Sequence, residues 1–577
     1  MTAPLAADPP PLDVLIIGAG LSGIGAARHL QHRCPRLTWS IVEARADLGG
    51  TWDLFRYPGI RSDSDLYTFG YDFKPWTGAN AIADGPSIKA YIAETARETG
   101  VDRRIRFRRR VVDADWSSTE RAWRATLRDE DSGATEVVRA RWLFNATGYY
   151  RYDRGHAPTF PDQDRFEGRI VHPQHWPEDL DWTGRRVVII GSGATAVTML
   201  PAMADRAAHV TMLQRTPGYV MPVPEQDPVA RRLRPWLGER RTHAITRRIN
   251  IAKQRWVFAR RLIRRVNAKF LPPGYPVDVH FNPPYDPWDQ RLCAVPGADL
   301  FRAIASGRAS VVTDHVERFL PRGIRLRSGA ELEADLIVTA TGLELLPLGG
   351  LPLRVDGVPV RLPEHVTYKG MMLSDVPNFA TAVGYTSSSW TLKIGLLCEH
   401  FCALLNHMDA KGLAVCTPRA PADLRTQPML NFGAGYVQRS IDALPKQGDR
   451  HPWLTSWDYA SDAKRLRHGR VDDPALEFVP QASAPPPDTA VDAPARAAAS
   501  AGCHRALVDR DAEGVARTAR EVAPGTSGDT VRVSAHCLDL VDHEGIRRLP
   551  EAVLAAHPAV HLLVNNAGIA VGGTFEQ

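Results

Sequence analysis

Two glycine-rich stretches, IIGAGLSG at Ile16–Gly23 and IIGSGATA at Ile189–Ala196, decide how this chain folds. Each follows a β-like run, DVLII or RRVVII, and each leads into small residues that are typical of a helix. Such glycines let the backbone approach a pyrophosphate at a helix N-terminus. We therefore expect an α/β protein with two Rossmann-like units. The expected dinucleotide contacts are Gly18, Gly20, Ser22, Gly23, Gly191, Ser192, Gly193, Ala194, Thr195, Ala196 and Val197.

The residues that end the next strand of each unit indicate which nucleotide it takes. After the first turn, LTWSIVEA ends in Glu43, about 20 residues beyond Gly23, where an acid binds the adenosine ribose hydroxyls. After the second, HVTMLQRTP ends in Arg215 and Thr216. An acid there would repel a 2′-phosphate, whereas a guanidinium binds it. The second nucleotide is therefore predicted to be NADPH.

The composition is that of an ordinary globular protein, with 44% hydrophobic and 24% charged residues among 577. Two to four domains are expected at this length. No apolar run reaches the roughly 18 residues that cross a bilayer, and MTAPLAADPPPLD is not a signal peptide. The seven cysteines contain no CxxC pair, which argues against a zinc site and against a dithiol centre. A reducing, cytoplasmic setting is expected.

The net charge of +6 comes from one segment. Residues 231–270 contain 14 Lys and Arg and a single acid, Glu239, so that the remainder of the chain carries about −7. Such local basicity argues against nucleic-acid binding. The segment lies in a predicted helical insertion, about 225–275, with one expected apolar stripe: Ile245, Ile249, Ala252, Trp256, Ala259, Ile263 and Val266. That helix either caps the NADPH unit or rests on an anionic membrane surface, which gives peripheral contact with the membrane's inner face.

Between the two turns lies FEGRIVHPQHWP, Phe166–Pro177, with the pattern F-x-G-x-x-x-H-x-x-x-W-P. This resembles the fingerprint of flavin-dependent class B monooxygenases, and proline after Trp176 is its Baeyer–Villiger form. The segments HFNPPYDPWDQRLCAVPGADLF (280–301) and YKGMMLSDVPNFATAVGYTSSSWTLK (368–393) resemble the subgroup that contains the ethionamide-activating monooxygenase. The resemblance covers about residues 10–480 and implies FAD as the first nucleotide.

The resemblance also implies roles for residues outside the glycine turns. In GGTWDLFRYPGIRSD, which we expect to be an ordered loop, the FAD-lining residues would be Thr51, Trp52, Asp53 and Leu54. Arg61, Ser62 and Asp63 would lie where flavin and nicotinamide meet, and the backbone at Val111 would touch the adenine. Arg291 would be catalytic, held by Asp63. Trp390 is a candidate wall of the substrate cavity.

The implied reaction is NADPH-driven reduction of FAD followed by transfer of one oxygen atom of O2, through a C4a-(hydro)peroxyflavin, to a lipophilic ketone, sulfide or thioamide. Arg291 would supply fixed positive charge to that step. Two alternatives stay open: an N-hydroxylating or amine-oxygenating relative, and a flavin-bound electron-transfer or scaffold protein with a dehydrogenase-recruiting tail.

The predicted organisation follows from these motifs and from a Pro/Ala-rich linker. Beyond the linker, CHRALVDRD and VRVSAHCLDL read as strands, with acids at Asp509 and Asp539, and NNAG at Asn565–Gly568 resembles short-chain dehydrogenases. Because the opening G-x-x-x-G-x-G turn of that family is missing, we expect a partial, non-catalytic Rossmann-like fragment. The expected divisions are a lead-in at 1–12, an FAD-binding segment at 13–150, the NADPH-binding domain at 151–345, a second FAD segment with the substrate cavity at 346–480, the linker at 481–500 and the fragment at 501–577.

Overall fold

A computed structural model describes residues 10–253, 260–287, 289–386, 388–430 and 432–481, and the backbone of two later strands, 505–509 and 533–537. The chain divides into two compact units, Met1–Pro480 and Gln481–Gln577. In the second unit β26 (Arg505–Asp509) and β27 (Val533–Cys537) pair in parallel. Both strands lie within the runs predicted as strands, CHRALVDRD and VRVSAHCLDL, whereas Asp539 and the NNAG motif lie outside the described residues.

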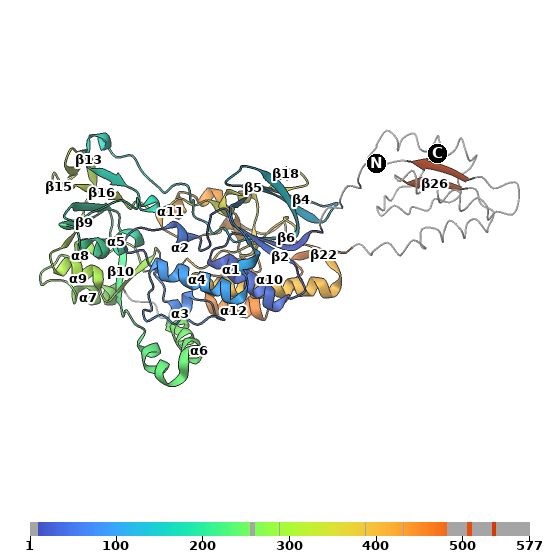
Figure 1. Ribbon diagram of the computed structural model, residues 1–577, viewed down its shortest axis with the longest axis horizontal. Coiled ribbons are helices and arrows are strands. Elements are labelled where there is room, and N and C mark those ends of the chain that lie inside the picture. Colours follow the sequence, from blue (N-terminus) through green and yellow to red (C-terminus); the bar gives the residue numbers. More distant parts are fainter. Residues whose placement is uncertain are drawn as a thin grey trace. The chain divides into compact units, whose positions relative to one another are not determined.

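The first sheet of the Met1–Pro480 unit contains the strand that leads into the first glycine turn (Figure 1). Its parallel part pairs β1 with β2 and β6, β2 with β3, and β6 with β21. The extension beyond β6 pairs β6 with β5 and β5 with β4 antiparallel, β4 with β17 in parallel, and β17 with β18 antiparallel. The strands are β1 (Leu12–Ile17), β2 (Trp39–Val42), β3 (Ile105–Arg106), β4 (Arg109–Ser117), β5 (Ala122–Asp129), β6 (Thr135–Asn145), β17 (Leu353–Val355), β18 (Val358–Pro359) and β21 (Phe379–Thr381).

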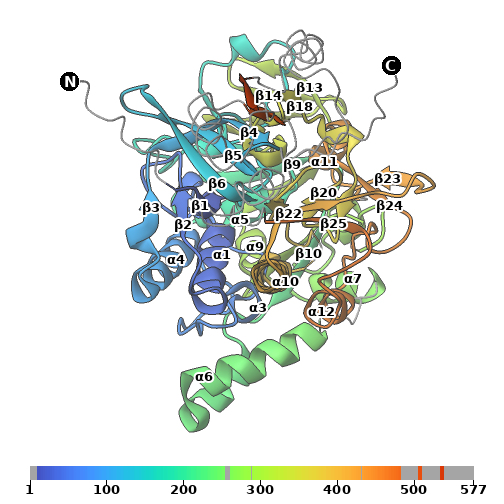
Figure 2. The same ribbon diagram turned by 90° about the vertical axis from the view of Figure 1, so that its right-hand side faces the viewer.

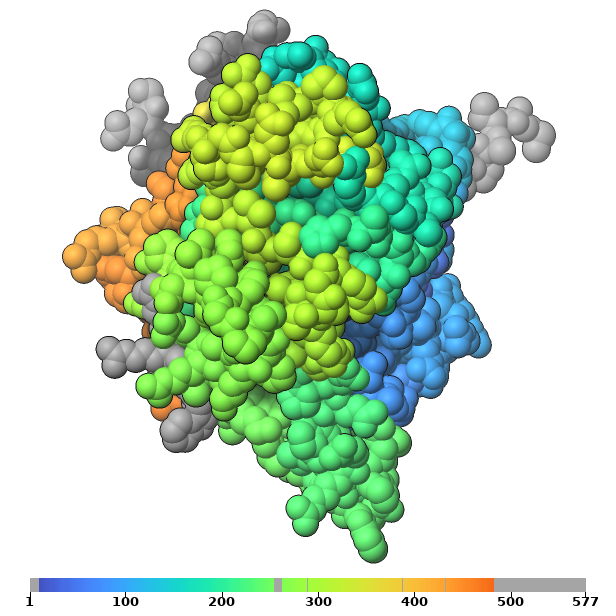
Figure 3. Space-filling view, turned by 90° about the vertical axis from the view of Figure 1, so that its left-hand side faces the viewer, coloured from blue at the N-terminus to red at the C-terminus, as the bar shows by residue number. Residues whose placement is uncertain are grey.

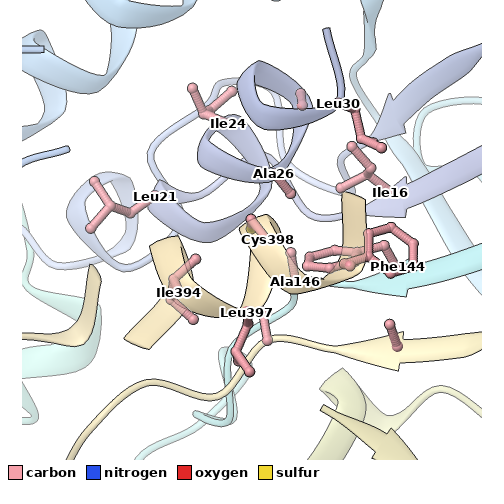
Figure 4. Close-up of a cluster of buried hydrophobic side chains, with 14 of the residues drawn as sticks. Ile16, Leu21, Ile24, Ala26, Leu30, Phe144, Ala146, Ile394, Leu397 and Cys398 are labelled. Atoms are coloured by element: carbon pink, nitrogen blue, oxygen red, sulfur yellow. The ribbon is translucent and has the colours of Figure 1, made fainter. Parts of the chain in front are cut away.

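Helices α1 (Leu21–Arg33) and α10 (Trp390–Lys411) pack against each other beside this sheet, although more than 350 residues separate them in sequence. Figure 4 shows Ala26 of α1 next to Cys398 of α10, with Phe144 of β6 close by, and the same buried cluster includes Leu21, Ile24, Ile394 and Leu397. These side chains are buried, so that the core of the sheet and its two helices is continuous. Helix α4 (Gly85–Thr99) adds Ile88, Tyr91 and Ile92 to the same core.

The second sheet contains the strand that leads into the second glycine turn. It is wholly parallel, in the order β12-β9-β8-β16-β7. The prediction of two Rossmann-like units is therefore confirmed. Helices α5 (Ala194–Ala204) and α9 (Asp299–Ala305) pack on it. Its strands are β7 (Arg169–Val171), β8 (Arg186–Ile190), β9 (His209–Gln214), β12 (Ala309–Thr313) and β16 (Leu336–Thr339), and smaller sheets join β10 (Tyr219–Val223) with β11 (Leu292–Pro296) and β13 (Val316–Leu320) with β14 (Gly323–Leu326) and β15 (Glu331–Glu333).

The chain crosses between the two sheets at two ATG segments, Ala146–Gly148 and Ala340–Gly342, and each crossing touches the first glycine of one turn. A Cβ on Gly18 would lie 2.8 Å from the carbonyl oxygen of Ala146, and one on Gly191 would lie 2.2 Å from that of Ala340. Both glycines have positive φ, +106° and +144°. Only glycine fits at these points, because space and backbone conformation both exclude a side chain.

The stretch Gly49–Tyr71, expected to be a loop, contains two single-turn helices, α2 (Thr51–Leu54) and α3 (Leu66–Phe69). The side chain of Asp65 accepts a hydrogen bond from the backbone N–H of Thr68 and so caps α3, a local signal that helical periodicity does not capture. Phe55 and Tyr57 pack in the core of the second sheet, whereas Tyr67 and Phe69 pack in that of the first. This stretch therefore joins both cores.

The insertion forms α6 (Pro228–Lys253) and α7 (Arg260–Ala268), and α6 projects from the body of the unit (Figures 2 and 3). The predicted apolar stripe is wrong for α6. Ala252 is exposed and Ile245 and Ile249 are only half-buried, while the buried face from the second helical segment onward is polar: Thr242, His243, Thr246 and Asn250. Asn250 donates to Asp65 and Asp227, and Arg247 donates to carbonyl groups of the loop beneath, so that polar partners select this face.

The remaining elements complete the first unit around these layers. They are α8 (Val277–His280), α11 (Gly435–Gln438), α12 (Tyr459–Arg467), β19 (Thr367–Tyr368), β20 (Met372–Leu373), β22 (Leu413–Pro418), β23 (Thr426–Pro428), β24 (Lys446–Gly448) and β25 (Leu476–Pro480), with single 3₁₀ turns at Asp102–Arg104, Gln163–Arg165, Pro173–His175, Pro347–Gly350, Leu362–Glu364 and Ile441–Ala443. Over the part of the chain that the structure describes, no helix combines the length and apolar character needed to cross a membrane.

The two helical glycines Gly23 and Gly395 should respond in opposite ways to alanine. A Cβ on Gly23 would lie 1.9 Å from the carbonyl oxygen of Gly18, whereas one on Gly395 meets no atom within 4 Å. We expect Gly23→Ala to destabilise the protein by about 1–3 kcal/mol through overpacking. Gly395→Ala should stabilise it by up to about 1 kcal/mol through helix propensity. Thermal unfolding followed by circular dichroism measures both, and a wild-type midpoint for Gly23→Ala would contradict the packing described.

Candidate active site

The first glycine turn and Glu43 meet through direct hydrogen bonds. The backbone N–H of Ala19 donates to Oε2 of Glu43 at 2.7 Å, and that of Arg45 donates to Oε1 at 2.9 Å. Burial raises the pKa of Glu43 in spite of these bonds. Each oxygen keeps a lone pair for a further donor, as a ribose hydroxyl would supply. Gly18, Gly20 and Gly23 lie in the same turn, and Ser22 Oγ accepts from the indole N–H of Trp390 at 2.8 Å.

Helix α2 lies beside this turn because the N–H of Gly49 donates to the carbonyl of Ala19 at 3.0 Å. Thr51, Trp52, Asp53 and Leu54 make up α2, and Asp53 is buried between two cations. Its Oδ2 accepts from Arg45 at 2.5 Å and its Oδ1 from Lys89 at 2.7 Å. Burial raises the pKa of Asp53, but Lys89 and Arg45 outweigh it and leave the pKa lowered. Asp53 therefore orients α2 as an ionised carboxylate.

Val111 lies on β4 at a register shift between β4 and β5. Two residues before it, the N–H of Arg109 donates to the backbone carbonyl of Glu43 at 2.9 Å, so that this strand runs beside the acid of the first turn. Val111 itself is buried. The structure thus brings Val111 into the neighbourhood of Glu43.

The second turn is more open than the first. A Cβ on Gly193 would meet no atom within 4 Å, and Ser192 Oγ donates to the carbonyl of Thr216 at 2.8 Å. Ala194, Thr195, Ala196 and Val197 form the first turn of α5. Arg215 is exposed next to Thr216, and among the described residues it forms no ion pair. Its guanidinium therefore lies at the end of β9 with its donors available.

Arg61, Ser62 and Asp63 occupy the middle of the Gly49–Tyr71 stretch, where the two cores meet. Arg61 donates to both carboxylate oxygens of Asp299, at 2.5 and 3.3 Å, which fastens the stretch to the start of α9. Ser62 is buried, and its N–H donates to the carbonyl of Ala83. Asp63 Oδ2 lies 3.5 Å from a guanidinium nitrogen of Arg291. The predicted pair of Asp63 and Arg291 is thus brought together.

Arg291 is surrounded by hydroxyl groups as well as by Asp63. Tyr149 and Tyr150 lie 3.4 Å apart at their hydroxyls, and the rings of Tyr150 and Tyr436 are 6.2 Å apart. Tyr150, then Tyr436, Tyr149 and Asp63, raise the pKa of Arg291 against the effect of burial. Burial raises the pKa of Tyr150 to about 12, so that this tyrosine is neutral at physiological pH.

Several buried polar atoms at this point have no hydrogen-bond partner among the described residues: Arg61 Nε, Asp63 Oδ1, Arg291 Nε and Tyr436 OH. Unpaired buried groups of this kind are rare in native proteins and indicate a missing partner. The N-termini of α1 and α5 also lack a side-chain cap. Free N–H groups at two helix starts and unpaired donors between them fit two bound dinucleotides with their redox rings in between.

The FxGxxxHxxxWP stretch lies at the crossing between the sheets. β7, which contains Arg169–Val171, pairs with β16 and leads directly to His172. A Cβ on Gly155 would lie 2.0 Å from the ring of His172, and Trp176 packs edge-on against Trp182 at 5.9 Å. Phe166 is buried against Phe319. In the structure these residues hold the crossing chain in place.

Two parts of the site were missed by sequence reasoning. Asp299, the partner of Arg61, belongs to a distant helix start and carries no local signal. The tyrosines had a weak one, because Tyr149 and Tyr150 follow the first ATG directly. Trp390 contacts both the first turn, through Ser22, and Tyr149, whose ring is 5.3 Å away.

Family profiles match three parts of the chain. The flavin-binding monooxygenase-like profile matches residues 77–271, and the NAD(P)-binding Rossmann-like domain matches residues 16–82. The short chain dehydrogenase profile matches residues 492–577.

Curated relatives match over nearly their whole length. The FAD-containing monooxygenase EthA of Mycobacterium tuberculosis is 50% identical over 478 residues, which is 81% of this chain and 97% of EthA. The probable FAD-binding monooxygenase AlmA of Acinetobacter sp is 45% identical over 478 residues, 81% of this chain and 96% of AlmA. Among solved structures, a steroid monooxygenase bound to NADP matches at 21% identity with a TM-score of 0.64, covering 82% of this chain and all of that one.

Proposed function

The chain belongs to the FAD-containing monooxygenases and uses FAD and NADPH, and from this premise we propose that it transfers one oxygen atom of O2 to a lipophilic ketone, sulfide or thioamide. The observation that carries the proposal is the meeting of Arg291 with Asp63, at 3.5 Å, between the two glycine turns. A nitrogen centre is the alternative acceptor.

The residues present fit both cofactors. FAD would be held by the first turn, by Glu43, by α2 and by the strand that contains Val111. NADPH would be held by the second turn, with Arg215 on the 2′-phosphate. FAD, when bound, supplies the ring that takes hydride from NADPH and activates O2. The described residues supply the shape and the charge around that ring.

Arg291 is the residue we assign to the oxygen-transfer step. Its guanidinium is charged because the ordinary pKa of arginine lies far above physiological pH, and Asp63 orients it. A fixed cation in a partly desolvated site stabilises negative charge that develops on oxygen. Burial raises the pKa of Asp63, which Arg291 and then Arg61 oppose, so that this carboxylate depends on the guanidinium beside it. Neutral hydroxyl groups also lie around the guanidinium of Arg291, from Tyr149, Tyr150 and Tyr436.

The projecting helix α6 supports contact with a membrane surface. Trp236 is 86% exposed near a kink at Gly238, and Arg231, Arg232, Arg240 and Arg241 around it are exposed. The one acid of the helix, Glu239, is paired with Arg234 at 3.2 Å. An exposed indole among guanidinium groups is suited to the boundary between lipid headgroups and acyl chains. We infer peripheral contact with an anionic bilayer, through which a lipophilic substrate reaches the enzyme.

We infer that residues 501–577 supply no chemistry of their own. The profile match to short chain dehydrogenases and the parallel pair β26–β27 support a partial Rossmann-like fragment. The phosphate-binding turn that opens that family is missing before Arg505. A role in recruiting a dehydrogenase partner is the testable alternative, which pull-down with and without residues 481–577 would reveal.

Replacing Arg291 should separate flavin reduction from oxygenation. We expect Arg291→Ala to keep NADPH-driven reduction and to lower oxygenated product by about 10²–10³-fold, because one charged donor to the reacting oxygen is lost. Hydrogen peroxide should account for the NADPH consumed. Product mass spectrometry with a ketone, a sulfide and a tertiary amine measures this. Arg302→Ala, on an exposed arginine of α9, is the control. Wild-type oxygenation by Arg291→Ala would contradict the assigned role, and peroxide alone from the wild type would contradict the proposed function.

Arg215 should decide between NADPH and NADH. We expect Arg215→Ala to raise the KM for NADPH by about tenfold or more and to leave the KM for NADH within about twofold. The substitution removes a charge-assisted pair of hydrogen bonds to the 2′-phosphate, which NADH lacks. Steady-state NAD(P)H oxidation at fixed ionic strength measures both. Arg206→Ala, an exposed arginine paired with Asp181, is a matched control. An equal loss for both nucleotides would exclude 2′-phosphate recognition.

Trp236 and its neighbouring arginines should control binding to vesicles. The wild type should sediment with phosphatidylglycerol vesicles and not with phosphatidylcholine vesicles, and less so at high salt. Trp236→Ala, and the double change Arg240→Glu with Arg241→Glu, should each weaken binding by about tenfold. Val358→Ala, which alters an exposed apolar residue elsewhere, is the control. Absence of binding to anionic vesicles, or full binding by both variants, would exclude this surface.

A further inference from the structure

A cavity of about 260 Å³ lies away from the two glycine turns, between α1, α6, α10, α12 and the loop at Tyr71–Asp72. Residues from all five segments line it, although they are distant in sequence. It begins one turn beyond Ser22 on α1, at Gly25, and one residue beyond Trp390 on α10, at Thr391. The cavity is thus built on the two helices whose N-terminal ends reach the first glycine turn.

Arg247 of α6 brings a cation to this cavity and forms no ion pair with the described residues, although the charges of Asp72 and Asp65 act on it from a distance and oppose the lowering of its pKa by burial. One of its nitrogens donates to the carbonyls of Tyr67, Thr68 and Gly70, at 2.9, 3.2 and 2.9 Å. No carboxylate of the described residues lies within 4.0 Å of the guanidinium, and the sequence of residues 254–259, QRWVFA, contains no acid. Burial lowers the pKa of Arg247, so that its charge is held against desolvation. A half-buried cation of this kind is stabilised by an anion.

The other charged groups of the lining form no ion pair with Arg247. Arg467 is already paired with Glu399 at 2.5 Å, and Arg248 is exposed and forms no ion pair within the residues described. Asp72, the acid of the lining, is exposed and lies outside ion-pair distance of Arg247, although its charge acts to raise the pKa of that guanidinium. Burial lowers the pKa of His29 and that of His243, the latter to about 4, so that both rings are neutral. One carboxylate faces two unpaired guanidiniums, which leaves the lining short of one negative charge.

Apart from Thr391 and the two histidines, the uncharged part of the lining is largely apolar, and it includes a glycine that keeps the cavity open. Leu392, Ile394, Ile251 and the rings of Tyr71 and Tyr459 line the cavity. Gly395 interrupts α10, a helix of 22 residues, and a Cβ there would meet no atom within 4 Å. A glycine inside a helix is about 1 kcal/mol less favourable than alanine, so Gly395 does not serve to stabilise the helix. The ligand that fits has an apolar body and a single negative charge.

We propose that this cavity binds an amphipathic monocarboxylate, with its carboxylate on Arg247 and its hydrocarbon part against Gly395 and Leu392. A carboxylate matches the planar fork of a guanidinium, and the volume suits a short acyl chain. A dianionic phosphate would exceed the missing charge and would leave the apolar wall without a partner. The site does not depend on the reaction proposed above, because none of its residues belongs to that machinery.

The test is titration calorimetry of the full-length, FAD-loaded protein with sodium octanoate, with octylamine and inorganic phosphate as comparison ligands. Octanoate should bind with one site, and octylamine and phosphate should not bind at the same concentrations. Gly395→Leu, which fills the cavity, should weaken octanoate binding by about tenfold or more, equivalent to 1.4 kcal/mol. Gly395→Ala should stay within about twofold. Arg247→Lys, which keeps the charge and loses the fork, should weaken binding several-fold.

Three outcomes would overturn the proposal: no octanoate binding up to about 10 mM, equal binding of octylamine, or octanoate binding that Gly395→Leu and Arg247→Lys both leave unchanged. The last would place octanoate elsewhere, including the catalytic site, and NADPH oxidation with substrate should stay normal in Gly395→Leu. If Gly395→Leu does not fold, Gly395→Val and Arg247→Lys carry the same test.

Discussion

The close approach of two backbone segments at each glycine turn is the constraint on which the rest of the first unit depends. Gly18 lies against the carbonyl of Ala146, and Gly191 lies against that of Ala340. Each contact joins a nucleotide turn to the point where the chain leaves its sheet. Because neither contact tolerates a side chain, the turns and crossings keep one relative position. The stretch Gly49–Tyr71, anchored in both cores, then has a single path, and Arg61, Ser62 and Asp63 lie on it.

Local sequence patterns were enough to predict the elements around the turns. β1, α1, β8, α5 and β9 lie where the glycine spacing and the aliphatic runs place them, and Glu43 contacts the turn as expected. The pairing of Asp63 with Arg291, residues 228 positions apart, came from resemblance and not from any local pattern. Asp299 could not be predicted at all, because its partner Arg61 is brought to it only by the path of the Gly49–Tyr71 stretch.

The helix α6 shows why periodicity failed. Counting apolar residues selects Ile245, Ile249 and Ala252, yet the surface beneath this helix presents carbonyl oxygens of Tyr67, Thr68 and Gly70 and the carboxylate of Asp65. Leaving a buried polar group without a hydrogen-bond partner costs more free energy than leaving an apolar side chain partly exposed. Arg247 and Asn250 therefore turn inward, and the isoleucines lie to the side. No pattern within residues 228–253 predicts which face of α6 is buried, because the hydrogen-bond acceptors belong to another part of the chain.

The double anchoring of Gly49–Tyr71 has a consequence for building hybrid enzymes. Phe55 and Tyr57 of this stretch pack in the core of the second sheet, although in sequence they belong with the strands of the first. A graft that exchanges only the chain between the two ATG crossings would leave these two aromatic rings packed against the second-sheet core of a different homologue. Recombination between homologues should therefore carry the region near Phe55 along with the second sheet as one inherited block.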